Sequence, residues 1–324
     1  MFHYTRVVCH EMPDCNPQAT KVMWREAIPQ MAFSISIVLD PLLALSAMHL
    51  HSFTPTDSQL PMVISFYLDR TLAKYRELIP QIDGDLAEPL FLAAVMLCRI
   101  TWLLSHCCGP DGASASKLPL QTYHMLRGLE TLFLRKVDYW TGPGYSYFLR
   151  EEPVTLPEAV SDDISDKLNL IEKDLASLFK NFQCNFLPDS EKSVYQEAAD
   201  YISWLYKATL LDTEAGFLHR FVSTMPLRLQ PSFLSLLGCY DPHARALLAR
   251  SLVLFRLVQY KRWLQGTGNY DFFRNNVNSI RELLPTAYRW AVDWPCKVAV
   301  EETGENTFEI LRMSLQYPEG FNGE

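Results

Sequence analysis

The segment that most constrains the fold is a short apolar stretch near the N-terminus, DPLLALSAMHL, at residues 40–50. Asp40 is a residue type that caps helices, and Pro41 suits the first helical position, where no backbone donor is needed. The residues after them are apolar on nearly every helical face, except at Ser46 and His49. A helix that is apolar all round is buried in a core, and about eleven residues are too few to cross a bilayer, which needs about twenty. We therefore predict a buried central helix against which other helices pack.

Composition places the chain among globular proteins and argues against nucleic-acid binding. The chain has 324 residues, of which 48% are hydrophobic, so it can bury a large core. Its formal net charge is -8, and no run of lysine or arginine provides a phosphate-binding surface. The N-terminus has no apolar stretch of signal-peptide length, and no segment reaches about eighteen uncharged apolar residues. We expect no direct nucleic-acid binding by this chain, no membrane span, and a location in the cytoplasm, the nucleus or both.

The eight cysteines predict reduced thiols rather than disulfides or a metal cluster. They are scattered along a long chain, and no spacing is Cys-x-x-Cys. His106 lies beside Cys107 and Cys108, but adjacent side chains rarely converge on one ion and no second cluster completes four ligands. We therefore predict no metal site there.

Helical periodicity recurs along the chain, whereas alternating strand patterns with tight turns do not occur. An arginine in the apolar segment after Pro89, Arg99, needs an acceptor or a route to solvent, so we expect a partner for it. Asp241 and Pro242 repeat the pattern of a cap followed by proline. Helices are predicted at about 58–79, 88–108, 119–137, 161–178, 193–210, 214–223, 231–238, 241–266, 270–284 and 286–294.

The predicted fold class is all-α, with a single irregular multi-helix domain, a central buried helix and an apolar pocket. No repeat of fixed period is present, and both halves contain apolar helices that need each other to be covered. The main break in composition is a segment rich in Gly, Pro and aromatic residues that precedes an acidic stretch. We therefore predict one domain over residues 1–324, with a mobile seam at 140–165.

One short motif suggests metal chemistry. Asp162, Asp163 and Asp166 have the Asp-Asp-x-x-Asp spacing that lets carboxylates on one helical face hold magnesium ions against a diphosphate, as in class I terpene cyclases. The same residues also serve as caps and as partners of the helix dipole. A cyclase needs a second metal-binding element, and the nearest candidate, at residues 275–282, misses the spacing by one residue. Mg²⁺ is thus expected only under this alternative, and otherwise no cofactor is expected.

Other catalytic motifs are absent from the sequence. There is no Gly-x-Ser-x-Gly elbow, no Gly-x-Gly-x-x-Gly and no phosphate loop. His49 lies in an apolar environment, where a histidine bonded to a backbone carbonyl is more common than a catalytic base. Catalytic residues thus remain unknown. Methionine and aromatic residues are frequent in the apolar segments, as in pockets for apolar ligands and in ordinary helical cores. The predicted ligand-binding residues, chosen for their apolar placement, are Met48, His49, Met96, Trp102, Trp140, Tyr147, Phe148 and Phe255.

Several longer stretches resemble one known family. HYTRVVCHEM at residues 3–12 and VMWREAIPQMAFSISIVLDPLLALSAMHLH at residues 22–51 resemble the ligand-binding regulatory domain of fungal zinc-cluster transcription factors of the sterol uptake control type. Residues 66–78, 220–237, 241–255 and 283–295 resemble later helices of that family, so the likeness spans almost the whole chain. The resemblance does not assign the pocket residues individually.

The resemblance implies a helical domain with an apolar pocket for sterols or related lipids, often dimeric, whose ligand state controls nuclear entry and transcription. The six-cysteine zinc cluster and the basic linker after it are missing, so either the sequence starts at the domain edge or the protein keeps the pocket without a DNA reader. Two classes of function follow. One is a sensor that binds an apolar small molecule, with a homodimer as the expected assembly. The other is an enzyme of fungal secondary metabolism that cyclises or isomerises terpenoids or polyketides in the same pocket.

Overall fold

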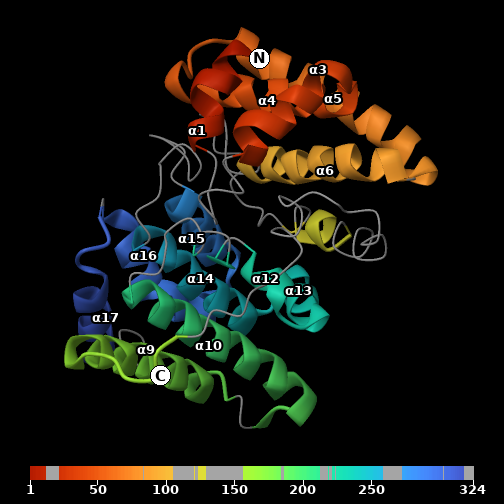
Figure 1. Ribbon diagram of the computed structural model, residues 1–324. Helices are drawn as coiled ribbons and strands as arrows, with labels where there is room; N and C mark the ends of the chain where they lie inside the picture. The colour runs from red at the N-terminus through yellow and green to blue at the C-terminus, as the bar shows by residue number, and fades with distance from the viewer. Residues whose placement is uncertain are drawn as a thin grey trace. The chain divides into compact units, whose positions relative to one another are not determined.

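The computed structural model describes residues 1–11, 22–82, 84–104, 120, 123–128, 156–183, 186–211, 218, 221–222, 224–257, 272–301 and 303–316. Every regular element in these ranges is a helix, which confirms the all-α prediction. The chain divides into two compact units (Figure 1). Unit 1 comprises Met1–Leu104, His124–Pro153 and Lys261–Thr267, and unit 2 comprises Ser105–Tyr123, Val154–Tyr260 and Gly268–Glu324. The prediction of a single domain stays a prediction, and most of its proposed seam, residues 140–155, lies outside the described ranges.

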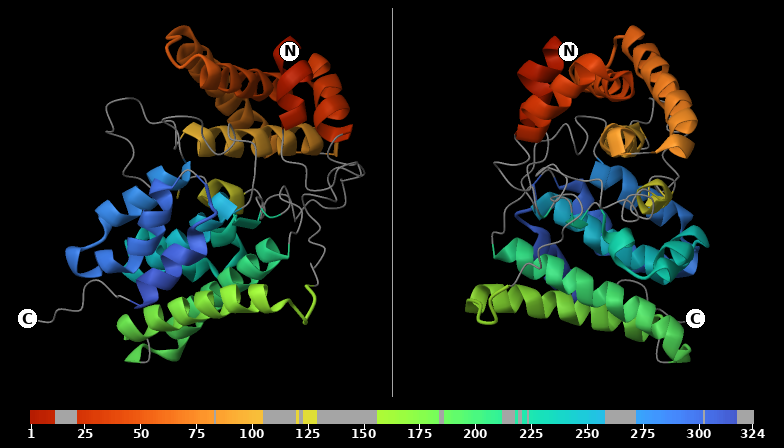
Figure 2. Two further views of the ribbon diagram at one scale, coloured as in Figure 1. Left: turned by 90° about the vertical axis from the view of Figure 1, so that its left-hand side faces the viewer. Right: turned by 45° about the vertical axis from the view of Figure 1, so that its right-hand side comes forward.

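Unit 1 is built around α4, which packs against α3, α5, α6 and η1. The views in Figures 1 and 2 place α5 and α6 alongside it. Eleven of its residues are buried, from Ile37 to His49, as expected for a helix that is apolar on most faces. In chain order, unit 1 contains η1 (Tyr4–Val8), α1 (Cys9–Glu11), η2 (Met23–Ala27), α3 (Ile28–Ser34), α4 (Ser36–Phe53), α5 (Gln59–Leu78), η3 (Ile79–Gln81) and α6 (Gly84–Leu104).

The start of α4 differs from the prediction. Asp40 and Pro41 lie inside the helix, which begins at Ser36 after the extended residue Ile35. The proline is tolerated near the start of the helix, where it removes only the backbone bond to the carbonyl of Ile37. The Asp40 carboxylate is therefore not a cap. It is almost completely buried and accepts a hydrogen bond of 2.8 Å from the Lys74 ammonium of α5.

The helix α4 has 18 residues and is therefore longer than the predicted segment 40–50, which is too short to cross a bilayer. By length and composition, α4 is the one helix in the described part of the chain that is able to cross a bilayer, and 61% of it is buried inside the protein. A helix buried against its neighbours to this extent is explained as a core helix.

Unit 2 has its own central helix, α14, which buries every residue from His243 to Phe255. It packs against α10, α13, α15, α16 and η7. Asp241 caps its N-terminus by accepting a hydrogen bond of 2.7 Å from the backbone N–H of Ala244, so the predicted cap is confirmed here. Unit 2 contains α9 (Asp162–Asn181), α10 (Asp189–Leu210), α12 (Met225–Arg228), α13 (Pro231–Gly238), α14 (Pro242–Leu257), α15 (Phe272–Leu283), η7 (Thr286–Val292), α16 (Asp293–Val300) and α17 (Thr307–Gln316).

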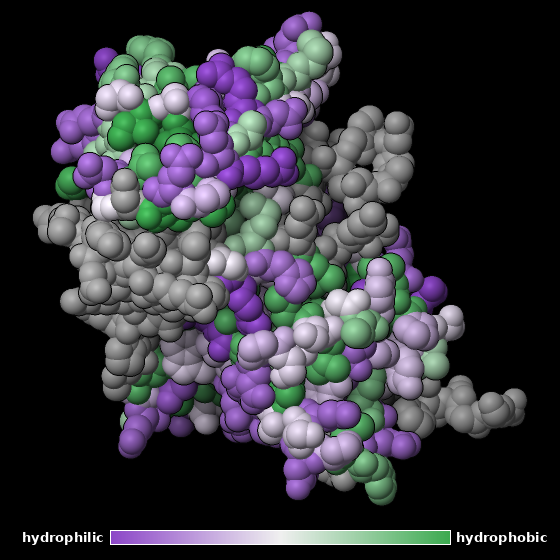
Figure 3. Space-filling view, turned by 90° about the vertical axis from the view of Figure 1, so that its right-hand side faces the viewer, coloured by the Kyte–Doolittle hydropathy of each residue, from purple (hydrophilic) through white to green (hydrophobic). Residues whose placement is uncertain are grey.

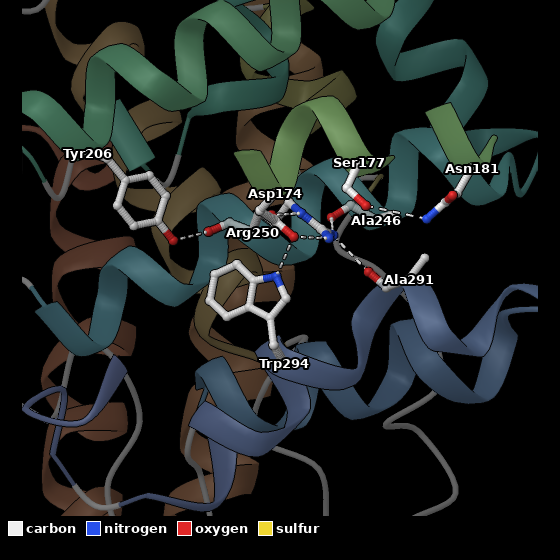
Figure 4. Close-up of polar contacts among 8 residues, drawn as sticks. All are labelled: Asp174, Ser177, Asn181, Tyr206, Ala246, Arg250, Ala291 and Trp294. Atoms are coloured by element: carbon white, nitrogen blue, oxygen red, sulfur yellow. Dashed lines mark hydrogen bonds and ion pairs between the residues drawn. The ribbon is translucent and has the colours of Figure 1, made fainter. Parts of the chain in front are cut away.

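A buried ion pair and its hydrogen-bonded neighbours join four helices of unit 2 (Figure 4). Two nitrogens of the Arg250 guanidinium donate to the two carboxylate oxygens of Asp174 over 2.6 and 2.9 Å. The indole N–H of Trp294 donates to the same carboxylate over 3.1 Å, and the Tyr206 hydroxyl donates to the carbonyl of Arg250 over 2.9 Å. Because the charged groups and their neighbours bond one another, the network fixes α9, α10, α14 and α16 in one arrangement.

The predicted helix ranges agree with the structure in most places. The helix at 231–238 is reproduced, and those at 58–79 and 270–284 shift by one or two residues. The helix predicted from Glu88 begins at Gly84, with Pro89 in its second turn. The range 286–294 is a 3-10 helix that continues as α16, and α17 was not predicted. Most of 119–137 and 214–223 lies outside the described residues.

Candidate functional site

The predicted pocket residues of α4 and α6 lie in the interior of unit 1. His49 and Met96 are fully buried and Met48 is 7% exposed. The two helices that carry them pack against each other. Methionine side chains adapt to irregular space, so this interior has the composition of an apolar binding region as well as of a core.

His49 is held by a second histidine. The Nε2 atom of His3 lies 2.8 Å from Nδ1 of His49, so one ring donates and the other accepts. The Phe53 ring lies 4.9 Å from the His49 ring, centroid to centroid. The hydrogen bond joins the N-terminal segment of the chain to the central helix, which explains a polar side chain in the apolar stretch 40–50.

The other predicted pocket side chains lie outside the described part of unit 1. Trp102 lies in α6, but its side chain is outside the description. Trp140, Tyr147 and Phe148 lie outside the described residues altogether. Phe255 belongs to α14 of unit 2, where it is 4% exposed. The ligand-binding role of the whole set stays a prediction.

The expected partner of Arg99 is an aromatic ring. Its guanidinium carbon lies 5.8 Å from the centroid of the Trp24 ring, within the range of a cation–π contact. The Trp24 carbonyl accepts a hydrogen bond of 3.1 Å from the hydroxyl of Tyr4. These contacts attach the N-terminal elements to α6.

One polar group in unit 1 was missed at the sequence level. The hydroxyl of Tyr75, on α5, is buried and has no hydrogen-bond partner. Burial raises its pKa above the ordinary tyrosine value, and the nearby Cys98 thiol of α6 raises it further. In the sequence, Tyr75 falls on the apolar face of its helix. The one sign that it needs a hydrogen-bond partner is the hydroxyl group of the tyrosine itself.

Large apolar side chains are exposed where α4 meets α5. The space-filling view shows hydrophobic and hydrophilic side chains interspersed over the surface (Figure 3). The exposed fractions at this corner are 38% for Leu50, 66% for Phe53, 57% for Met62, 37% for Val63 and 55% for Phe66. Single exposed apolar side chains are normal on a protein surface, but here several lie together on one pair of helices. This corner is therefore a candidate contact region.

Unit 2 carries an open groove of about 410 Å³ between α10 and the end of α12. Its floor includes Glu197, one of whose carboxylate oxygens is buried without a hydrogen-bond partner. The groove is open to solvent, whereas a site for a sterol covers most of the surface of its ligand. The groove is lined by Ser193, Gln196, Glu197, Asp200, Tyr201, Arg228 and Leu229.

The aspartate motif lies at the start of α9, and its role in metal binding stays a prediction. Asp162, Asp163 and Asp166 are exposed in the first turns of α9, and Asp163 pairs with Lys167 over 2.6 Å. The Ser161 side chain caps the same helix by accepting from the backbone N–H of Ile164. Across the described ranges, no three His, Cys, Asp or Glu side chains are grouped so that they can hold a metal ion. The three aspartates lie in the first turns of α9, where carboxylates interact favourably with the helix dipole.

Comparison with known proteins identifies the part of the chain that contains α4, α5 and α6. Residues 1–133 match the family model described as a fungal specific transcription factor domain. This part of the chain is thus similar to a fungal specific transcription factor domain. The resemblance to regulatory domains of fungal zinc-cluster factors is thereby confirmed, and it supports a role in transcriptional regulation.

Three relatives extend this result beyond the fungal specific transcription factor domain. A Zn(2)-C6 fungal-type transcription factor of Gibberella zeae is 24% identical over 93% of this chain and 61% of its own length. Sterol uptake control protein 2 of Candida albicans is 22% identical over 79% of this chain and 36% of its own length. The Zn(2)-C6 fungal-type transcription factor afumD of Aspergillus fumigatus is 26% identical over 30% of this chain and 26% of its own length. The chain therefore spans less than two thirds of each relative it matches.

Proposed function

We propose that this chain is a regulatory domain that binds an apolar small molecule, a sterol or another terpenoid or lipid, and thereby controls transcription in the nucleus. The observation that carries the proposal is the interior of unit 1, where Met48 and Met96 are buried on two helices of the part that matches a fungal specific transcription factor domain. The name of one relative, sterol uptake control protein 2, supports a sterol as the first ligand to test.

The proposed mechanism is a shift in population. A ligand that binds one arrangement of the helices of unit 1 more tightly than another favours that arrangement by its difference in affinity. The exposed apolar corner with Phe53, Met62 and Phe66 supplies a surface whose accessibility such a shift can change. A homodimer is proposed as the assembly on which the ligand acts.

The test is native mass spectrometry of the purified chain before and after incubation with sterols, terpenoids and prenyl diphosphates. Recovery of a bound sterol with its mass and its structure unchanged supports the sensor. Conversion of a probe to an isomer, or loss of its diphosphate, supports the enzyme alternative instead. Failure of every apolar probe to bind contradicts the proposal. The same spectra report whether the chain is a dimer and whether its ratio to monomer follows ligand occupancy.

A pair of variants locates the binding region. Met96→Ala removes a buried side chain from α6, and Met313→Ala removes one from α17 that is 50% exposed. If Met96 lines the pocket, its truncation changes ligand affinity, whereas Met313→Ala leaves affinity unchanged. If Met96 only fills the core, its truncation lowers stability by about 2–5 kcal/mol without a separate effect on binding.

A further inference from the structure

The buried hydroxyl of Tyr75 stands apart from the other hydroxyls inside unit 1. Ser46 donates to the carbonyl of Leu42 over 2.9 Å, and Thr71 donates to the carbonyl of Tyr67 over 2.7 Å. Among the side-chain hydroxyls of the described part of unit 1, Tyr75 is the one that is buried without a hydrogen-bond partner. A buried hydroxyl without a partner is costly, and in a native protein it calls for a specific explanation.

The surroundings of Tyr75 favour a neutral partner. Burial raises the pKa of Cys98 to about 12, and it also raises the pKa of Tyr75. Both groups are therefore uncharged at physiological pH. Elsewhere on α5, Lys74 and Arg70 pair with the carboxylate of Asp40, over 2.8 and 3.4 Å. A neutral hydroxyl or carbonyl group matches the Tyr75 hydroxyl, which can both donate and accept a hydrogen bond.

The position of Tyr75 also fits entry from the surface. α5 packs against both α4 and α6, but only Ile64 and Thr71 are buried along its length. It is the least covered of the three long helices of unit 1, and its first half carries the exposed side chains of Met62 and Phe66. A ligand that enters between α5 and α6 would replace contacts with water by apolar contacts. At this boundary it would contact the Tyr75 hydroxyl.

We propose that the Tyr75 hydroxyl binds the single hydroxyl or carbonyl group of an otherwise apolar ligand, at the boundary between α5 and α6. This inference rests on the proposed ligand-binding function and adds the residue that recognises the polar end of the ligand. The ligand class is an apolar molecule with one neutral polar group, as in a sterol alcohol.

The test compares two radiolabelled probes that differ in one group, cholesterol and its deoxy analogue cholestene, by equilibrium binding to the full chain. The wild-type chain is expected to bind cholesterol about fivefold to tenfold more tightly, which corresponds to about one net hydrogen bond. Tyr75→Phe is expected to abolish this preference while it keeps the affinity for the deoxy probe. Tyr67→Phe, which removes a hydroxyl from a half-buried position of the same helix, is the matched control and keeps the preference.

The outcomes separate this inference from the function on which it rests. Equal binding of the two probes by the wild type, or a preference that survives in Tyr75→Phe, overturns the role of Tyr75 and leaves the ligand-binding function standing. Failure of the wild type to bind either probe overturns both. The thermal midpoint of Tyr75→Phe without ligand is expected to equal or exceed that of the wild type. A lower midpoint would mean that the hydroxyl is already bonded in the free protein, which contradicts the proposal.

Discussion

Arg250 of α14 and Asp174 of α9 form a two-point ion pair in the interior of unit 2, although 76 positions separate them in the chain. Both side chains are more than nine-tenths buried. The remaining donors of the guanidinium reach the carbonyls of Ala246 and Ala291, over 3.0 and 2.7 Å. Arg250 thus joins its own helix, α14, to α9 and η7.

Substitution of Arg250 by methionine is expected to destabilise unit 2 strongly. It leaves the Asp174 carboxylate buried with Trp294 as its remaining donor, and a broken buried pair of this kind costs about 3–5 kcal/mol. Urea denaturation followed by circular dichroism measures the loss. The exposed pair of Arg312 and Glu309, 2.9 Å apart, is the control, and Arg312→Met is expected to cost less than about 1 kcal/mol. Equal losses in the two variants would contradict a special role for the buried pair.

Arg245 offers the opposite case on the same helix. It is 1% exposed, its Nε and Nη1 atoms have no hydrogen-bond partner, and its guanidinium stacks on the Tyr240 ring at 4.2 Å. Burial lowers the pKa of Arg245, because the charged form is desolvated, and this effect outweighs the opposite effects of Tyr240 and Asp241. Arg245→Met is therefore expected to leave stability unchanged or to raise it by about 1 kcal/mol.

The same urea experiment measures Arg245→Met beside Arg250→Met, so the two buried arginines of α14 control for each other. A loss of more than about 2 kcal/mol for Arg245→Met would show that its guanidinium contributes a favourable interaction in solution. Thermal denaturation gives an independent readout, with an unchanged or higher midpoint as the expected result.

Local sequence patterns predicted the helices better than their beginnings. Asp241 is a true cap because the preceding helix ends at Gly238. Tyr240 then adopts a positive φ of 65°, which interrupts the helical backbone just before Asp241. Before Asp40, no glycine marks a break, and the extended residue is Ile35. The Lys74 partner of Asp40 lies 34 positions away. A local sequence pattern cannot reveal a hydrogen-bond partner that lies so far away in the chain.

The candidate site shows the same limit. The burial of Met48, His49 and Met96 follows from apolar residues on all faces of two helices, and it was predicted. The hydrogen bond of His49 to His3 joins positions 46 apart. The isolation of the Tyr75 hydroxyl depends on which groups surround it in three dimensions. Both therefore needed the structure.

Substitution of Asp40 by asparagine distinguishes a buried ion pair from a helix cap. Asparagine caps a helix as well as aspartate, so a cap would survive the change. The structure instead predicts a loss of about 1–3 kcal/mol, since the hydrogen bond to the charged Lys74 is weakened in a buried setting. Asp241→Asn is the matched control at a true cap, with an expected change of less than about 0.5 kcal/mol. Two equally small changes in urea denaturation would restore the cap interpretation of Asp40.

His243 is expected to make unit 2 sensitive to acid. Its ring stacks on Phe182 and Tyr195, with centroids 4.8 and 4.2 Å away, and it is 3% exposed. Burial, together with the nearby charge of Arg250, lowers the pKa of His243 to about 3. In the unfolded chain the pKa of this histidine is about 6.5, so it binds a proton below that pH. In the folded chain the same side chain stays neutral down to a lower pH. The neutral histidine therefore favours the folded state fully above about pH 6.5, and this contribution is lost as the pH falls from there toward 3.

Comparison with His243→Phe isolates this effect, because phenylalanine keeps the aromatic stack and cannot be protonated. The stability of the wild type, measured by urea denaturation, is expected to fall relative to that of the variant by about 1 kcal/mol for each pH unit below 6.5. Carboxylates titrate over the same range in both proteins, so their contribution cancels in the difference. Parallel profiles for the two proteins between pH 6.5 and pH 4 would mean that His243 takes up its proton in the folded state, with the ring open to water, and would contradict its burial among Phe182 and Tyr195.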